Sequence, residues 1–191
     1  MGNKINEITF GGVTIVDAKK TDVRYDSKNQ PIYCVWFENG AYAEYPAQKK
    51  KSVTSYYAKD LLTNVQFQID EKTFNNGVTE KDGFEHEFSS FTAPNPSIFA
   101  EDSGHREDGK PIYDWAINGV DNLKFVGAPT RDDVYITNSN GADIVVDNNS
   151  GRDDVTVGVN CKSVKVHSEK VDEVVFFKGY KKGEGYFPNY K

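Results

Sequence analysis

The segments DDVYI (residues 132–136), DDVTV (residues 153–157) and DEVVF (residues 172–176) resemble one another and decide the fold. In each of them, apolar residues stand two positions apart, and a β-strand turns such residues to the same face. Three more strands of this pattern begin at Leu123, Ile144 and Val164. The six strands recur about every ten residues, which is typical of a repeat architecture.

Alternate strands of this series match better than neighbouring strands do, as expected if two strands make one coil of about 20 residues. The turns between them, such as residues 137–141, are rich in Asn and Gly, which tolerate the backbone of a tight corner. The chain is therefore predicted to be mostly β, with a short parallel β-solenoid over residues 119–179. This solenoid has about 10 residues per strand and two strands per coil.

Two stacks of apolar side chains follow from this interpretation. One stack is expected to contain Val134 with Ile136, Val155 with Val157, and Val174 with Phe176. The other is expected to contain Leu123 with Phe125, Ile144 with Val146, and Val164 with Val166. The residues between them, including Tyr135 and Val175, then point outward.

Residues 1–118 are predicted to form a β-rich region that opens with an antiparallel meander. Asn39-Gly40 is a strong hairpin signal between two runs of strand-forming residues. We expect strands within residues 8–18, 23–25, 32–37, 41–45, 65–69 and 84–88. Residues 47–64 are the one segment expected to be helical, and residues 92–111, with their prolines and glycines, are expected to be a long loop.

Two distant segments share a similar sequence. Residues 31–40 read PIYCVWFENG and residues 111–119 read PIYDWAING. Two interpretations stay open: two hairpins that share the same turn chemistry, or a duplicated unit.

The repeat over about residues 120–178 resembles a degenerate RTX-type β-roll, whose nonapeptide is G-G-x-G-x-D-x-U-x with U a large apolar residue. The matching positions are Gly151 and Asp153 before Val155, Gly127 and Asp132 before Val134, and Asp172 before Val174. Most glycines of the pattern are absent, and the corresponding aspartate positions before Ile144 and Val164 hold Ala142 and Lys162. The resemblance implies calcium between coils, with Asp132, Asp153 and Asp172 as ligands.

The same three aspartates have a second interpretation. Aspartates at turns also accept hydrogen bonds from backbone N–H groups, with no metal involved. The acidic edge of the coil, which continues through Asp133, Asp154 and Glu173, is repulsive unless solvent or a cation bridges the carboxylates. Calcium ligation and turn capping both stay open at this point.

Composition narrows the classes of partner. The net charge is 23 − 29 = −6, which disfavours nucleic acid as a partner. No stretch approaches 18 apolar residues, so no membrane-spanning helix is expected. Cys34 and Cys161 fit no zinc spacing. The N-terminus lacks the apolar run of a signal peptide, so we expect a cytoplasmic protein or one exported without a cleaved signal.

The sequence contains no catalytic motif and suggests no cofactor other than calcium. We expect a non-enzymatic protein that binds another protein, such as a secreted effector, a toxin-associated module or an inhibitor of a host or competitor enzyme. The residues expected to bind the partner are Tyr135 and, in the aromatic tail of residues 180–191, Tyr180, Tyr186, Phe187 and Tyr190. The tail could equally fold back over the open end of the solenoid.

Two alternative functions stay open. One is a calcium-binding module of the RTX type. The other is a carbohydrate-active enzyme with an acidic cleft, which predicts a carboxylate whose pKa is raised in a groove. The oligomeric state is left open by the sequence.

Overall fold

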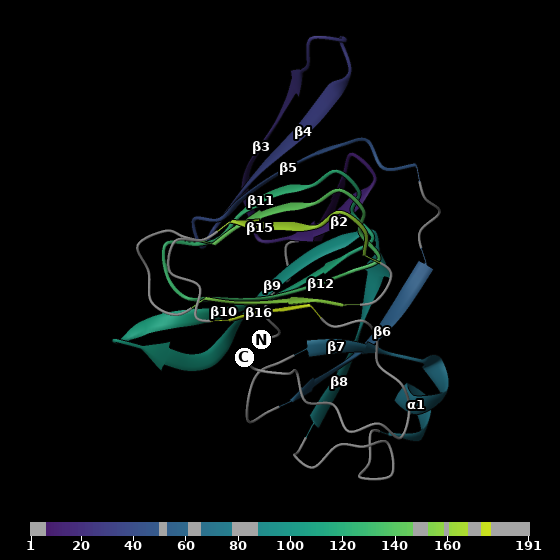
Figure 1. Cartoon of the computed structure of the whole chain (residues 1–191), viewed down its shortest axis with the longest axis vertical. Helices are drawn as coiled ribbons and strands as arrows, with labels where there is room; N and C mark the ends of the chain where they lie inside the picture. Colours follow the sequence, from purple (N-terminus) through teal and green to yellow (C-terminus); the bar gives the residue numbers. More distant parts are fainter. Residues whose placement is uncertain are drawn as a thin grey trace.

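The computed structural model describes residues 7–49, 53–60, 66–77, 88–146, 153–158, 161–167 and 173–176 (Figure 1). These ranges are mostly β-strand, so the prediction of a mostly-β fold is confirmed. The strands form three sheets, and the one helix among the described residues is the short α1 (Glu71–Asn76).

The largest sheet has seven strands in the order β1-β2-β9-β10-β12-β14-β16. Its strands are β1 (Glu7–Phe10), β2 (Val13–Val16), β9 (Ser97–Glu107), β10 (Lys110–Asn118), β12 (Asp132–Thr137), β14 (Asp154–Val157) and β16 (Glu173–Phe176). From β10 to β16 all pairings are parallel.

The second sheet has six strands in the order β15-β13-β11-β5-β4-β3 and lies opposite the first (Figure 1). Its strands are β3 (Ala18–Tyr25), β4 (Pro31–Phe37), β5 (Tyr42–Pro46), β11 (Lys124–Val126), β13 (Asp143–Val145) and β15 (Lys165–His167). Strands β3, β4 and β5 pair antiparallel, so the predicted meander is confirmed. Strands β11, β13 and β15 pair in parallel.

The parallel registers agree with one predicted stack and correct the other. Val134 pairs with Val155 and Val155 with Val174, as the alternate-strand comparison predicts. In the other sheet Ile144 is level with Phe125, not with Leu123. This expectation was wrong because a shift of two residues keeps the same face inward, so a period of two cannot tell the two registers apart.

The core lies between the two large sheets and draws on strands from both halves of the chain. The fully buried Trp115 of β10 packs edge-on against Phe37 of β4 and Phe125 of β11, with ring centroids 5.1 Å and 4.8 Å apart. Since β5 pairs with β11 and β10 with β12, the boundary expected near residue 118 falls inside both sheets.

The segment 47–64, expected to be helical, contains a strand instead. Strand β6 (Val53–Asp60) pairs antiparallel with β7 (Gln66–Ile69) and β8 (Phe88–Asn95) in a third sheet. The segment VTSYYA is rich in β-branched and aromatic residues, which fit a pleated sheet. The helix α1 begins later, where the Asp70 side chain accepts a hydrogen bond from the Thr73 amide at 2.6 Å.

The long loop expected over residues 92–111 is also wrong, because this segment contains the ends of β8 and β10 and all of β9. Pro94 is accommodated because β8 is an edge strand of its sheet. Asp108 and Gly109 both have positive φ and form the turn between β9 and β10. The two Pro-Ile-Tyr segments begin the second strands of two hairpins in opposite sheets.

Candidate functional site

Two of the three expected calcium ligands, Asp132 and Asp153, lie at the start of parallel strands. Their carboxylates accept hydrogen bonds from protein N–H groups. The carboxylate Oδ1 of the fully buried Asp132 accepts hydrogen bonds from Trp115 Nε1 at 2.8 Å and from the Ala128 amide at 3.2 Å. Asp153 Oδ1 accepts one from the Asp132 amide at 2.8 Å. Asp132 therefore caps the turn before β12, Asp153 accepts from the backbone of the neighbouring strand, and Asp172 lies outside the described residues.

Asp132 is unusual because its second oxygen, Oδ2, is buried and accepts no hydrogen bond. Burial raises the pKa of Asp132 well above its ordinary value, and the hydrogen bond from Trp115 opposes that shift. Among the described residues, no three His, Cys, Asp or Glu side chains are arranged to hold a metal ion.

The next residue along each strand points to the outer face of the seven-stranded sheet. The registers set Asp114, Asp133 and Asp154 level on β10, β12 and β14. Burial raises the pKa of Asp133 to about 8, while Arg131 opposes the shift and Asp154 adds to it. These three carboxylates form the acidic ladder.

Arg131 is the cation that bridges this ladder. Its guanidinium donates to Asp133 Oδ1 at 3.2 Å, to Asp154 Oδ2 at 2.8 Å and to Glu107 Oε2 at 3.3 Å. One arginine thus joins β12, β14 and the β9–β10 hairpin. The sequence predicts solvent or a cation between the carboxylates of the acidic edge. Within the described residues, the cation found there is the Arg131 guanidinium.

Tyr135 was expected to be exposed for a partner, and this expectation was wrong. It points away from the core, as the alternation predicts, but the third sheet covers it and only 3% of it is exposed. Tyr57 of β6 contacts it edge-on at 6.4 Å, and the Tyr57 hydroxyl lies 3.2 Å from Thr137 Oγ1. The other expected contact residues, Tyr180, Tyr186, Phe187 and Tyr190, lie outside the described residues.

A cavity of about 220 Å³ is lined by residues of both large sheets. Its lining residues come from the β2–β3 junction, the end of β4, and β9 and β10: Asp17, Phe37, Glu38, Asn39, Ala100, Glu101, Asp102 and Tyr113. Phe37, Ala100 and Tyr113 give it an apolar wall, and four acidic residues with Asn39 form the remainder of the lining. Glu101 is level with Asp114, so its carboxylate lies on the other face of β9 from Ala100 and Asp102. We call this cavity the acidic cavity.

The backbone fixes the position of two of these carboxylates. Asp17 has a φ of 56°, and its carbonyl accepts a hydrogen bond from the Glu38 amide at 2.9 Å, which ties the β2–β3 junction to the β4–β5 turn. Asp102 accepts hydrogen bonds from Arg106 at 2.8 and 3.1 Å, and these lower the pKa of Asp102 together with the bond from the Gly104 amide. Asp102 is therefore ionised at neutral pH.

Sequence reasoning missed the acidic cavity. Asp102 fell in the segment expected to be a loop, whereas in β9 it lies beside a turn that is more than sixty residues earlier in the chain. The signal that could have found it is the alternation of residues 97–101, which places Ile98 and Ala100 on one side of a strand.

Histidines and cysteines do not gather into a site in the part of the chain that is described. His105 is exposed in the β9–β10 hairpin, and His167 Nε2 lies 3.4 Å from Asp143 Oδ1 at the surface. Cys34 and Cys161 are both free thiols. His86 lies outside the described residues.

Comparison with known proteins gives no family, since no protein-family model, no curated protein and no solved structure matches the chain. No helix within the described ranges combines the length and the apolar character needed to cross a membrane.

Proposed function

We propose that this chain is a non-enzymatic binding protein whose partner is another protein, and that the acidic cavity receives a basic side chain of that partner. The observation that carries the proposal is the cavity of about 220 Å³, whose lining joins an apolar wall to acidic residues that include Asp17, Glu38 and Asp102. A cavity of this size suits one side chain rather than a folded segment.

Arginine is the side chain that fits this lining best. Its guanidinium is planar, always charged and weakly hydrated, so it can lie against the Tyr113 ring and donate to carboxylates at the same time. Asp102 is held in its ionised form, which keeps the cavity negative at neutral pH. Arg106 neutralises Asp102 in part, and the remaining carboxylates are left to attract the partner's cation.

The scaffold under this site supports the same proposal. We interpret the parallel stacks β11–β13–β15 and β12–β14–β16 as a short β-solenoid, because equivalent residues of successive strands are level in both stacks. A hydrogen-bonded scaffold of this kind holds surface residues in fixed positions, which lowers the entropy lost on binding. An inhibitor or effector module would gain affinity from such a surface.

The direct test measures binding of acetyl-arginine amide by NMR chemical-shift mapping, with acetyl-citrulline amide as a neutral ligand of the same shape. We expect shifts of the Ala100, Glu101 and Tyr113 amides with the first ligand alone. The variant Asp17→Asn/Glu38→Gln should weaken binding several-fold, since it removes two acidic residues of the lining. Glu7→Gln/Glu71→Gln removes two exposed carboxylates elsewhere and should bind like the wild type.

The partner itself is sought by affinity capture with these same two variants. A partner that uses the cavity is retained by wild type and by Glu7→Gln/Glu71→Gln, and is lost with Asp17→Asn/Glu38→Gln or with the cavity-filling Ala100→Leu. Capture of the same protein by all four would rule the cavity out as the binding site.

A second function is favoured by one separate observation. Asp133 has a pKa of about 8 and lies level with Asp154, which is only partly buried. Two neighbouring carboxyls, one of them with a raised pKa, are the kind of pair that glycosidases use, which supports a carbohydrate-active enzyme. Incubation with a panel of oligosaccharides tests it: turnover that Asp133→Asn abolishes would replace the binding proposal, and no turnover would remove the enzyme.

A further inference from the structure

The outer face of the six-stranded sheet carries an ordered pattern that the acidic cavity does not use. Pairing registers place six side chains level in one row across the sheet: Lys20, Trp36, Tyr42, Val126, Val145 and His167. The four central members are apolar and half-buried, and the two end members are exposed. We call this row the apolar row.

A second row lies beside it on the same face. Its members, in the same strand order, are Asp22, Cys34, Glu44, Lys124, Asp143 and Lys165. Acidic residues stand on β3 and β5, and basic residues stand on β11 and β15 on either side of the acidic Asp143 of β13. This charged row is therefore asymmetric: negative toward the β3 edge and more positive toward the β15 edge.

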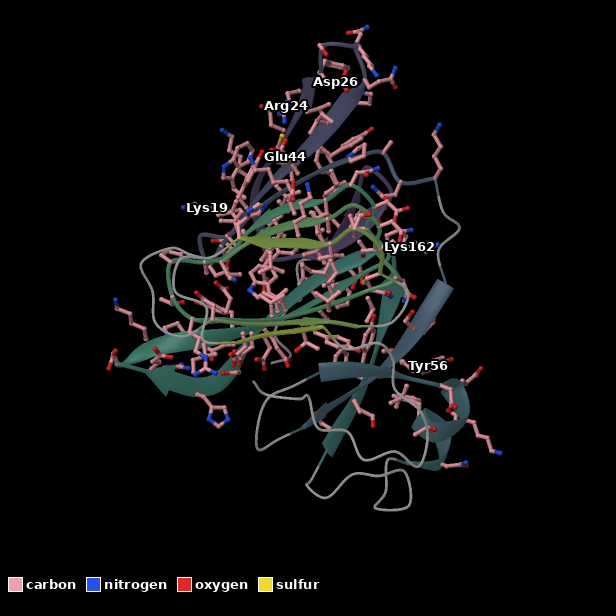
Figure 2. The ribbon with its side chains drawn as sticks, viewed as in Figure 1. Lys19, Arg24, Asp26, Glu44, Tyr56 and Lys162 are labelled. Atoms are coloured by element: carbon pink, nitrogen blue, oxygen red, sulfur yellow. The ribbon has the colours of Figure 1, made fainter. Side chains whose placement is uncertain are left out.

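In the described part of the chain this face has no covering layer. The extensive contacts of its strands are with their neighbours in the sheet, and the seven-stranded sheet lies on their other side (Figure 1). Trp36 contacts Tyr42 with ring centroids 5.1 Å apart, and the Lys20 ammonium lies 5.0 Å from the Trp36 ring. Arg24 pairs with Glu44 on the same face (Figure 2).

We propose that this face binds a second copy of the same chain about a two-fold axis that runs parallel to the strands between β5 and β11. Such an axis brings β3 opposite β15 and β5 opposite β11 of the other copy. Asp22 then faces Lys165, and Glu44 faces Lys124, so both contacts join opposite charges. In the apolar row, Trp36 faces Val145 and Tyr42 faces Val126.

A second copy fits this face because it supplies the complementary pattern automatically. In an isologous interface the same patch meets itself, so an acidic half and a basic half must lie on opposite sides of the axis. The charged row has that arrangement. Aromatic residues at the centre with charges at the rim are also the usual anatomy of a protein interface.

The size of the face sets the expected strength. Two rows across six strands cover roughly 400 Å² on each copy, taking ~4.8 Å between strands and ~7 Å between rows. This is at the low end for protein interfaces, where association is weak and transient. The dimer is therefore concentration-dependent, with a dissociation constant in the micromolar range or above.

Sedimentation velocity of the full chain over a wide concentration range tests the dimer. The wild type should shift from monomer to dimer as concentration rises. Val126→Asp should remain monomeric because it places an anion against the Tyr42 ring, and the two copies of that anion lie close together beside the axis. Glu7→Lys, in the other large sheet, is the matched control and should dimerise like the wild type. Thermal melting confirms that each variant is folded.

A charge-swap experiment tests the two-fold geometry itself. Asp22→Lys alone sets two bases against each other, and Lys165→Asp alone sets two acids against each other, so each variant should dimerise several-fold more weakly. An equimolar mixture of the two should recover the wild-type affinity, because every contact again joins an acid to a base. A wild type that stays monomeric up to millimolar concentration, or a mixture that gains nothing over the single variants, overturns the proposal.

The test is independent of the acidic cavity. None of the substituted residues lines that cavity. Loss of dimerisation with retained arginine binding, or the reverse, therefore separates the failure of one proposal from the failure of the other.

Discussion

Asp132 is a carboxylic acid that the fold buries completely. Its pKa is raised above the unfolded value, so the folded protein holds this proton more tightly than the unfolded chain does. The stability that this contributes is complete below pH about 3.9 and is lost as pH rises through the folded-state pKa. The buried oxygen Oδ2, which accepts no hydrogen bond, is the physical source of the effect.

We predict that Asp132→Asn removes this dependence. Asparagine keeps an oxygen for Trp115 Nε1 and the Ala128 amide but carries no ionisable proton. Urea unfolding at pH 5 and pH 8 should show that the variant gains stability relative to the wild type at the higher pH. A stability difference that is the same at both pH values would contradict the prediction.

Arg131 also contributes to stability, because it pairs with three carboxylates that come from different strands. Arg131→Met should lower the free energy of unfolding by about 3 kcal/mol, since it leaves partly buried carboxylates without their cation. The control is Arg106→Met, whose pair with Asp102 is exposed and should cost less than about 1 kcal/mol. Chemical denaturation of both variants measures the contrast, and equal losses would contradict it.

The sequence located these charged residues at strand starts but left their roles undecided. Asp132 and Asp133 are neighbours in the DDV motif, yet one faces Trp115 in the core and the other faces Arg131 outside. The partner Trp115 lies 17 residues away, on another strand. A local pattern contains no information on such a contact, so calcium ligation and turn capping could not be separated from the motif alone.

At the scale of the element, periodicity of two located the strands well wherever one face is buried. The same periodicity was a poorer guide where the composition of a segment suggested another structure. Residues 53–60 form the central strand of the third sheet, which lies outside the main core. Apolar residues stand on both faces of this strand, so their spacing resembles that of a weak amphipathic helix. Residues 97–107 end in a charged hairpin, which resembles a loop in composition although the backbone is fully paired near its start.

The packing of the third sheet depends on the small residue that follows β14. A Cβ at Gly158 would lie 2.7 Å from the Tyr135 hydroxyl oxygen and 2.8 Å from Thr137 Cγ2, both of which are buried. We predict that Gly158→Ala costs about 1–3 kcal/mol in urea unfolding, because the tyrosine under the third sheet must move.

Two variants make this test specific. Gly104→Ala introduces a Cβ with nothing within 4 Å, at a φ of +83°, and reports the cost of backbone strain alone. Gly158→Ala combined with Tyr135→Phe removes the hydroxyl that the new methyl group would meet. The pair should be less than additive, and strict additivity would show that the clash is not with Tyr135.

At the scale of the molecule, the two halves of the chain complete each other's sheets. Strands β4 and β5 continue the stack of β11, β13 and β15, while β9 and β10 continue the stack of β12, β14 and β16. A repeat protein protects its open ends with capping elements. In the β-solenoid that we propose, the N-terminal strands are the cap of one end, and they contribute Phe37 and Trp115 to the shared core.

We therefore predict that a fragment of residues 119–191 does not fold alone. Without β5 and β10 both parallel stacks lose their neighbours, and Leu123, Phe125 and Val134 lose the aromatic side chains that bury them. Its amide NMR spectrum should lack dispersion, and adding a fragment of residues 1–118 should restore the spectrum of the full chain. A cooperative thermal transition of the isolated fragment would show instead that the parallel stacks are a domain in their own right, with the N-terminal strands as an attachment.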